Sequence, residues 1–215
     1  MNVLIDLDGT LTDPAEGIIA SLRHALAAMG HRSPEDRELK RFVGPPLQES
    51  FAELLGSGDP ATIAAAVGHY RERYSAKGMF ENSVYPEIPS ALAALQALGA
   101  SLFVATSKPT VYAERSAERF DLGRYFKAIY GSELDGARSN KTELIAHLLT
   151  AEALSAGSTC MVGDRSHDVI AARANGVFPV GVLWGYGSRH ELVAAGASAL
   201  CERPGELSRA LQFSS

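Results

Sequence analysis

Residues 2–10 read NVLIDLDGT, and this stretch decides how the rest of the chain is interpreted. Its apolar part, residues 2–7, predicts a short buried strand, and Gly9 predicts a tight turn after it. Side chains two residues apart in an extended strand point the same way. We therefore expect the carboxylates of Asp6 and Asp8 to meet beyond the strand, where their mutual repulsion favours a bound cation. A plain surface turn is the alternative, because Asp and Gly both favour turns.

Similar short apolar runs recur at residues 101–106, 128–130, 159–162 and 177–183. Helical patterns separate these runs, and several of them end in glycine. Strands that alternate with helices predict a parallel sheet covered on both faces, with a site at the carboxyl ends of the strands. The predicted fold class is therefore α/β, a Rossmann-like core with three layers in the order helices, sheet, helices.

The strand patterns disappear between residues 14 and 83, where the apolar residues recur at helical spacing. Within this segment Asp59 and Pro60 predict a helix start, because Asp caps helix N-termini and Pro suits the first helical position. We therefore expect a helical cap domain at about residues 14–83. It would be inserted into a catalytic core made of residues 1–13 and 84–215.

Two further acids follow the predicted strand at residues 159–162. Asp164 comes directly after this strand, and Asp168 lies four residues later at a helix start. Four acids in one crevice would repel one another strongly unless they were neutralised. Mg²⁺ suits such a set, because it takes a few carboxylates together with water and phosphate oxygens. Asp168 would also serve as a helix cap, and the two roles are compatible.

Hydroxyl groups follow the predicted strand at residues 101–106. Thr106 and Ser107 precede a helix that is expected to open at Pro109. Hydroxyls and free backbone N–H groups at a helix start form an anion site, although simple capping is an alternative.

One lysine is expected to face the acids, and Lys141 is the first candidate because it begins the helix before the Asp164 strand. Lys108 and Lys127 are the alternatives. We expect Lys127 to point along a strand and Lys108 to point into the adjoining helix, which favours Lys141.

Together these residues resemble the four motifs of the haloacid dehalogenase superfamily, in order: Asp6-Leu7-Asp8-Gly9-Thr10, Thr106, Lys141, and Gly163-Asp164 with Asp168. The resemblance implies that Asp6 is the nucleophile, which forms an aspartyl-phosphate, and that Asp8 is the general acid/base. Thr106 and Lys141 would hold the phosphoryl oxygens. Mg²⁺ would be held by Asp6, the backbone carbonyl of Asp8, and Asp164, with Asp168 close behind or bound through water.

The inserted segment resembles the helical cap of phosphoglycolate phosphatase-like members. Several stretches, among them Val43-Gly44-Pro45-Pro46-Leu47 and Ala105-Thr106-Ser107-Lys108-Pro109, resemble bacterial 5′-nucleotidases of the superfamily. Ser107 departs from many relatives, in which asparagine follows the threonine. This departure puts a side-chain contact with the substrate in doubt, but not one from the backbone N–H.

Two cap residues are candidates for substrate binding. Gly44 begins a stiff loop that would descend over the site and exclude water. Arg41, like Arg71, would bind a second anionic group, and a solvated helix position is the alternative for each arginine.

The resemblance therefore implies a Mg²⁺-dependent phosphomonoester hydrolase, first of all a 5′-nucleotidase acting on nucleoside monophosphates. A phosphoglycolate phosphatase is the alternative, and a β-phosphoglucomutase-like phosphomutase is a further one.

Composition narrows the partners. A formal net charge of −5 argues against a nucleic-acid polymer as ligand. No apolar stretch approaches 18 residues, which argues against a membrane span. The N-terminus lacks a basic segment typical of signal peptides. We expect a cytoplasmic protein, a monomer or a homodimer, that acts on a small phosphorylated metabolite.

Overall fold

The computed structural model describes residues 1–212, and the chain divides into two compact units. One unit consists of Met1–Asp13 and Val84–Ser215, and the other of Pro14–Ser83. The chain passes between them at β2 (Thr12–Asp13) and β3 (Ser83–Val84), which pair as a two-stranded sheet.

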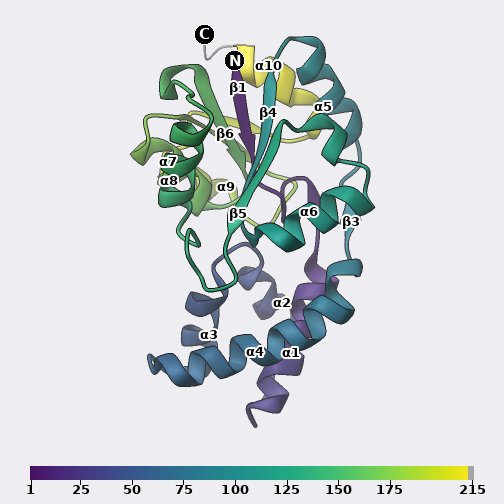
Figure 1. The fold of residues 1–215 in the computed structure, drawn as a ribbon, viewed down its shortest axis with the longest axis vertical. Helices are drawn as coiled ribbons and strands as arrows, with labels where there is room; N and C mark the ends of the chain where they lie inside the picture. The colour runs from purple at the N-terminus through teal and green to yellow at the C-terminus, as the bar shows by residue number, and fades with distance from the viewer. Residues whose placement is uncertain (213–215) are drawn as a thin grey trace. The chain divides into compact units, whose positions relative to one another are not determined.

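The larger unit is built on a six-stranded parallel sheet with the order β5-β4-β1-β6-β7-β8 (Figure 1). Its strands are β1 (Asn2–Ile5), β4 (Ser101–Pro109), β5 (Ala128–Ser132), β6 (Thr159–Gly163), β7 (Phe178–Val182) and β8 (Ala199–Cys201). β1 lies between β4 and β6, and Ile5 is in register with Val104 and Val162. The carboxyl ends of these three parallel strands therefore lie at the same edge of the sheet.

Helices cover both faces of this sheet, which confirms the predicted three-layer α/β fold. One layer contains α5 (Ile88–Ala97), α6 (Thr110–Arg119) and α10 (Leu207–Gln212), and the other contains α7 (Lys141–Ala151) and α8 (Ser166–Ala174). The remaining helical segments of the unit are α9 (Arg189–Ala195), η3 (Gly123–Tyr125), η4 (Ala156–Ser158) and η5 (Pro204–Glu206). Buried aliphatic side chains fill both interfaces, so the sheet is apolar on its two faces, as parallel sheets require.

The smaller unit is helical. It contains α1 (Ala15–Ala28), α2 (Asp36–Leu39), η1 (Lys40–Phe42), α3 (Leu47–Leu55), α4 (Pro60–Ala76) and η2 (Gly78–Phe80). The predicted start of α4 is confirmed, because the Asp59 carboxylate accepts a hydrogen bond from Thr62 N at 2.9 Å. Tyr70 and Tyr74 are buried and stacked on each other, so they pack the core of this unit.

Several strands differ from the sequence prediction, among them β1, β4 and β8. β1 ends at Ile5 rather than at residue 7, because Leu7 O accepts hydrogen bonds from the N–H groups of Leu11 and Thr12 and the chain turns. β4 continues to Pro109, three residues beyond its predicted end. β8 was not predicted, since its three residues are too few to show a periodic pattern.

Across the described residues, no helix has both the length and the apolar character that a membrane crossing requires.

Candidate active site

Three buried carboxylates meet at the carboxyl edge of the sheet. Asp6 follows β1, Asp164 follows the adjacent strand β6, and Asp168 lies in the first turn of α8. One oxygen of each lies within 4.8 Å of the others. All three side chains are buried, so the structure gathers negative charge in a place that water screens poorly.

Lys141 faces this group. Its Nζ lies 2.8 Å from Asp6 Oδ1 and 2.6 Å from Asp168 Oδ1. The lysine is the first residue of α7, and Asn140 caps the helix by accepting a hydrogen bond from Thr142 N at 2.8 Å. The capped helix end therefore fixes where the ammonium group stands.

Burial and neighbouring charges shift the pKa values of Asp164, Asp168 and Lys141. Burial, together with the carboxylates of Asp168 and Asp6, raises the pKa of Asp164 to about 8. Burial also raises the pKa of Asp168 to about 6, although Lys141 opposes this shift. Burial lowers the pKa of Lys141, but Asp168 and Asp6 outweigh it and hold the pKa above its usual value.

Glycines allow the chain to pass close to Asp164. A Cβ on Gly9 would lie 2.4 Å from Asp164 Oδ2, and Gly9 has a φ of +89°. A Cβ on Gly187 would lie 1.8 Å from the Asp164 carbonyl oxygen. Both positions therefore require glycine.

The loop after β7 also holds Asp164, a contact that was not predicted from the sequence. Tyr186 N donates to Asp164 Oδ2 at 2.8 Å, and the Thr10 hydroxyl donates to Asp164 Oδ1 at 3.2 Å. Trp184 Nε1 donates to Thr10 O at 2.9 Å and ties the loop to the turn after β1. The available signal was the Trp-Gly-Tyr-Gly run at residues 184–187, directly after a predicted strand.

The structure corrects the predicted direction of the Lys108 side chain. It was expected to point into the adjoining helix, but its Nζ lies 2.9 Å and 3.0 Å from the two carboxylate oxygens of Asp8. The reason is the extra length of β4: Thr106 and Lys108 are both buried while Ser107 between them is half-buried, the alternation of a strand. Lys108 N also donates to Thr106 Oγ1 at 3.3 Å.

Asp8 is thus placed beside Lys108, and it is not one of the three acids that converge. If all six groups are ionised, the four acids together with Lys108 and Lys141 leave two negative charges. One divalent cation would neutralise them. The oxygen-only donor set fits Mg²⁺, which is a hard ion that prefers carboxylates, carbonyls and water.

The remaining candidates lie in the helical unit. Arg41, in η1, is exposed, pairs with Glu53, and has its guanidinium 4.8 Å from the ring centre of Phe42. Gly44 has a φ of +105°, so it makes a turn that favours glycine. Arg71 is half-buried, and its Nε has no hydrogen-bond partner among the described residues.

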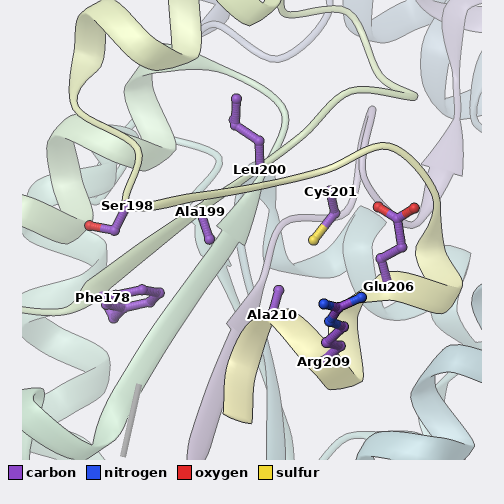
Figure 2. A pocket seen from close by; sticks show the side chains of 8 residues that line it. All are labelled: Phe178, Ser198, Ala199, Leu200, Cys201, Glu206, Arg209 and Ala210. Carbon is purple, nitrogen blue, oxygen red and sulfur yellow. The ribbon is translucent and has the colours of Figure 1, made fainter. Parts of the chain in front are cut away.

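A pocket of about 400 Å³ lies elsewhere in the larger unit, at the β7–β8 edge (Figure 2). Its lining is largely apolar, with Glu206 and Arg209 at one end. Burial, together with Glu206, raises the pKa of the Cys201 thiol in this lining to about 11. The acids and lysines of the site do not line this pocket, so it is separate from them.

The family model of haloacid dehalogenase-like hydrolases matches residues 3–182. A 5′-nucleotidase from Pseudomonas aeruginosa is 50% identical over 200 residues, which cover 93% of this chain and 90% of that protein. A tyrosine-protein kinase, PtkA, from Mycobacterium tuberculosis is 43% identical over 185 residues, which cover 86% of this chain but 62% of that protein.

A phosphoglycolate phosphatase from Agrobacterium fabrum is 31% identical over 187 residues, covering 85% of this chain and 80% of that protein. Among solved structures, a predicted phosphatase from Clostridium acetobutylicum superposes with a TM-score of 0.95 at 42% identity, covering 99% of this chain and 98% of that one. These matches confirm the expectation that the protein is a phosphoric monoester hydrolase. The chain belongs to the haloacid dehalogenase-like hydrolase family.

Proposed function

We propose that this protein is a Mg²⁺-dependent phosphomonoester hydrolase that works through an aspartyl-phosphate on Asp6. The observation that carries the proposal is the buried group of Asp6, Asp164 and Asp168 beside Lys141 at the carboxyl edge of the sheet. Parallel α/β folds bind ligands at this edge.

In the first half-reaction a carboxylate oxygen of Asp6 attacks phosphorus, and the bond from phosphorus to the ester oxygen breaks. A carboxylate and a dianionic ester repel each other, so positioning and charge compensation supply most of the rate enhancement. Lys141 Nζ, 2.8 Å from Asp6 Oδ1, would hold a phosphoryl oxygen while Asp6 attacks. Thr106 and the backbone N–H of Ser107 would hold others, and Asp8 would give a proton to the leaving oxygen.

In the second half-reaction water attacks the phosphorus of the aspartyl-phosphate. The bond from phosphorus to Asp6 breaks, and the proton of the water passes to Asp8. The products are inorganic phosphate and the free carboxylate of Asp6.

Asp6, the backbone carbonyl of Asp8, and Asp164 would hold Mg²⁺, with Asp168 binding directly or through water. When bound, the ion supplies positive charge that offsets the charge on the phosphoryl oxygens. The three carboxylates within 4.8 Å and their oxygen-only donor set support this part of the proposal.

A nucleoside 5′-monophosphate is the proposed substrate, acted on in the cytoplasm by a monomer or homodimer. The 50% identity to a protein named 5′-nucleotidase supports it over phosphoglycolate, whose named phosphatase is 31% identical. Arg41 and Gly44 in the helical unit are proposed to contribute to substrate binding. A phosphomutase would share the core residues but would release little phosphate.

The test is a phosphate-release screen with nucleoside monophosphates, phosphoglycolate and sugar phosphates, run with Mg²⁺ and with EDTA. Nucleotide-selective release that EDTA abolishes and added Mg²⁺ restores would support the proposal. Selective release from phosphoglycolate would replace the substrate and keep the chemistry. Isomerisation of a sugar phosphate without net release would contradict hydrolysis.

A further inference from the structure

Asp8 and Lys108 form an ion pair that is almost fully buried. The side chains are 11% and 4% exposed, and Nζ lies 2.9 Å and 3.0 Å from the two oxygens of the carboxylate. Because both oxygens contact the same ammonium group, the pair fixes the orientation of the carboxylate plane as well as its position.

Stability alone is a weak reason for such a pair. Removing two charges from water carries a large desolvation cost, and apolar residues of similar volume often stabilise a fold equally well. The two residues are 100 positions apart in the chain: Asp8 lies in the turn after β1, and Lys108 lies near the carboxyl end of the neighbouring strand β4. The pair therefore occurs where the proposed chemistry takes place.

We propose that Lys108 is a positioning residue that orients the Asp8 carboxylate to receive the proton of the water that attacks the aspartyl-phosphate. The inference rests on the proposed function. In this step the water oxygen bonds to phosphorus, the bond from phosphorus to Asp6 breaks, and the proton goes to Asp8. An ammonium that contacts both oxygens of the base fixes the orientation of the carboxylate, as the step requires.

The neighbours of the pair support this role over a purely structural one. Lys108 N donates to Thr106 Oγ1 at 3.3 Å, so the lysine is also tied to the residue proposed to hold a phosphoryl oxygen. Gly9 N donates to Thr12 O at 2.8 Å in the turn that follows Asp8. The backbone around Asp8 is thus set by the turn, and the direction of its side chain is set by Lys108.

The experiment is a rapid-quench comparison of wild type and Lys108→Met with p-nitrophenyl phosphate and Mg²⁺. Nitrophenolate is a good leaving group that needs no proton, so Asp6 should still be phosphorylated. Hydrolysis of the aspartyl-phosphate should slow about 10- to 100-fold. We expect a burst approaching one equivalent of nitrophenol and acid-trapped phosphoenzyme in Lys108→Met. Lys108→Arg should restore part of the second step, and Lys127→Met, which alters an exposed lysine next to β5, should behave as wild type.

A double-mutant cycle separates positioning from general damage. If Lys108 acts through Asp8, then Lys108→Met should add nothing to the slow dephosphorylation of Asp8→Asn. Thermal unfolding of each variant verifies that it is folded. A Lys108→Met variant that loses activity without accumulating phosphoenzyme, or whose loss adds fully to that of Asp8→Asn, would overturn the inference. If wild type neither releases phosphate nor forms a phosphoenzyme, the proposed function itself is wrong and this inference falls with it.

Discussion

At the scale of single residues, the site is a balance of buried charges. Asp6, Asp164 and Asp168 stand within 4.8 Å of one another, and burial raises the pKa of Asp164 to about 8. Such an arrangement costs folding free energy and is typical of functional positions rather than of sites optimised for stability. Replacing one of these acids should therefore affect catalysis and stability in opposite directions.

Asp6→Asn is the clearest case. Without the nucleophile, we expect phosphate release to fall at least about 1000-fold. The free energy of unfolding without Mg²⁺ should stay the same or rise, because one of three repelling charges is removed. Steady-state assays and thermal unfolding measure the two effects. Activity near that of wild type in a folded variant would contradict the assignment of Asp6.

Gly9→Ala tests the contact between the turn and Asp164. The new Cβ would lie 2.4 Å from Asp164 Oδ2 at a φ of +89°, so we expect a loss of about 3 kcal/mol from strain and overlap. Gly99→Ala is the matched control: its φ is +78° but nothing lies within 4 Å, so the conformational cost of about 1 kcal/mol should stand alone. Denaturant unfolding measures both, and equal losses would show that the close contact is unimportant.

At the scale of elements, strand ends and helix starts place the reactive groups. β1, β4 and β6 are adjacent, so residues that follow them reach one edge, and α7 brings Lys141 there as its first residue. The position of that ammonium depends on how well the first turn of α7 is held, because a helix start leaves N–H groups unpaired. Its cap is thus a part of the site that does not touch substrate.

Asn140→Ala removes this cap. We expect a loss of about 1 kcal/mol in stability, together with a several-fold loss of activity as the first turn loosens around Lys141. Asn140→Ser supplies another good capping side chain and should recover both. Calorimetry and steady-state kinetics provide the readouts. Full activity in a destabilised Asn140→Ala protein would show that Lys141 is held by its ion pairs alone.

At the scale of the whole molecule, a pair of half-buried tyrosines, Tyr85 and Tyr186, lies near the segments that connect the two units of the chain. The hydroxyl of Tyr186 donates to Asp13, at the end of β2, and hydrogen-bonds with Tyr85, which follows β3. Burial and the hydrogen bond to Asp13 raise the pKa of Tyr186 well above its usual value. Burial and the Asp13 charge likewise raise the pKa of Tyr85.

These shifts predict a loss of stability in alkali. The folded state holds the tyrosine protons more tightly than the unfolded state does. These tyrosines therefore contribute fully to the free energy of unfolding below about pH 10, where unfolded tyrosine titrates, and the contribution is lost as the pH rises above that value. Tyr186→Phe lacks the hydrogen bond but cannot ionise at this position. The difference in free energy of unfolding between wild type and Tyr186→Phe, measured by urea titration, should therefore become smaller above about pH 10. A difference in free energy of unfolding that stays constant across that pH range would contradict the raised pKa of Tyr186.

Much of the fold could be predicted from local sequence pattern. Apolar runs predict strands near their observed positions, and apolar residues at helical spacing predict the helices between them. The start of α4, in the smaller unit, follows from Asp59 and Pro60 alone. The ends of strands were predicted less accurately, because the turn after Ile5 depends on hydrogen bonds to Leu7 O. β8 was not predicted, because three residues are too few to show a pattern. Such short elements exist only through their neighbours in the sheet.

The sequence by itself determined the alternation of strands and helices, the family, and the candidate residues of the site. Periodicity and each motif depend on residues that are close together in the chain, and the order of the motifs can be read directly along it. Tertiary structure decided that Lys108 pairs with Asp8 and that Tyr186 N holds Asp164. These contacts join residues 100 and 22 positions apart. They depend on strand order and on where β4 ends, which the sum of many weak packing interactions sets, and no short stretch of sequence carries that information.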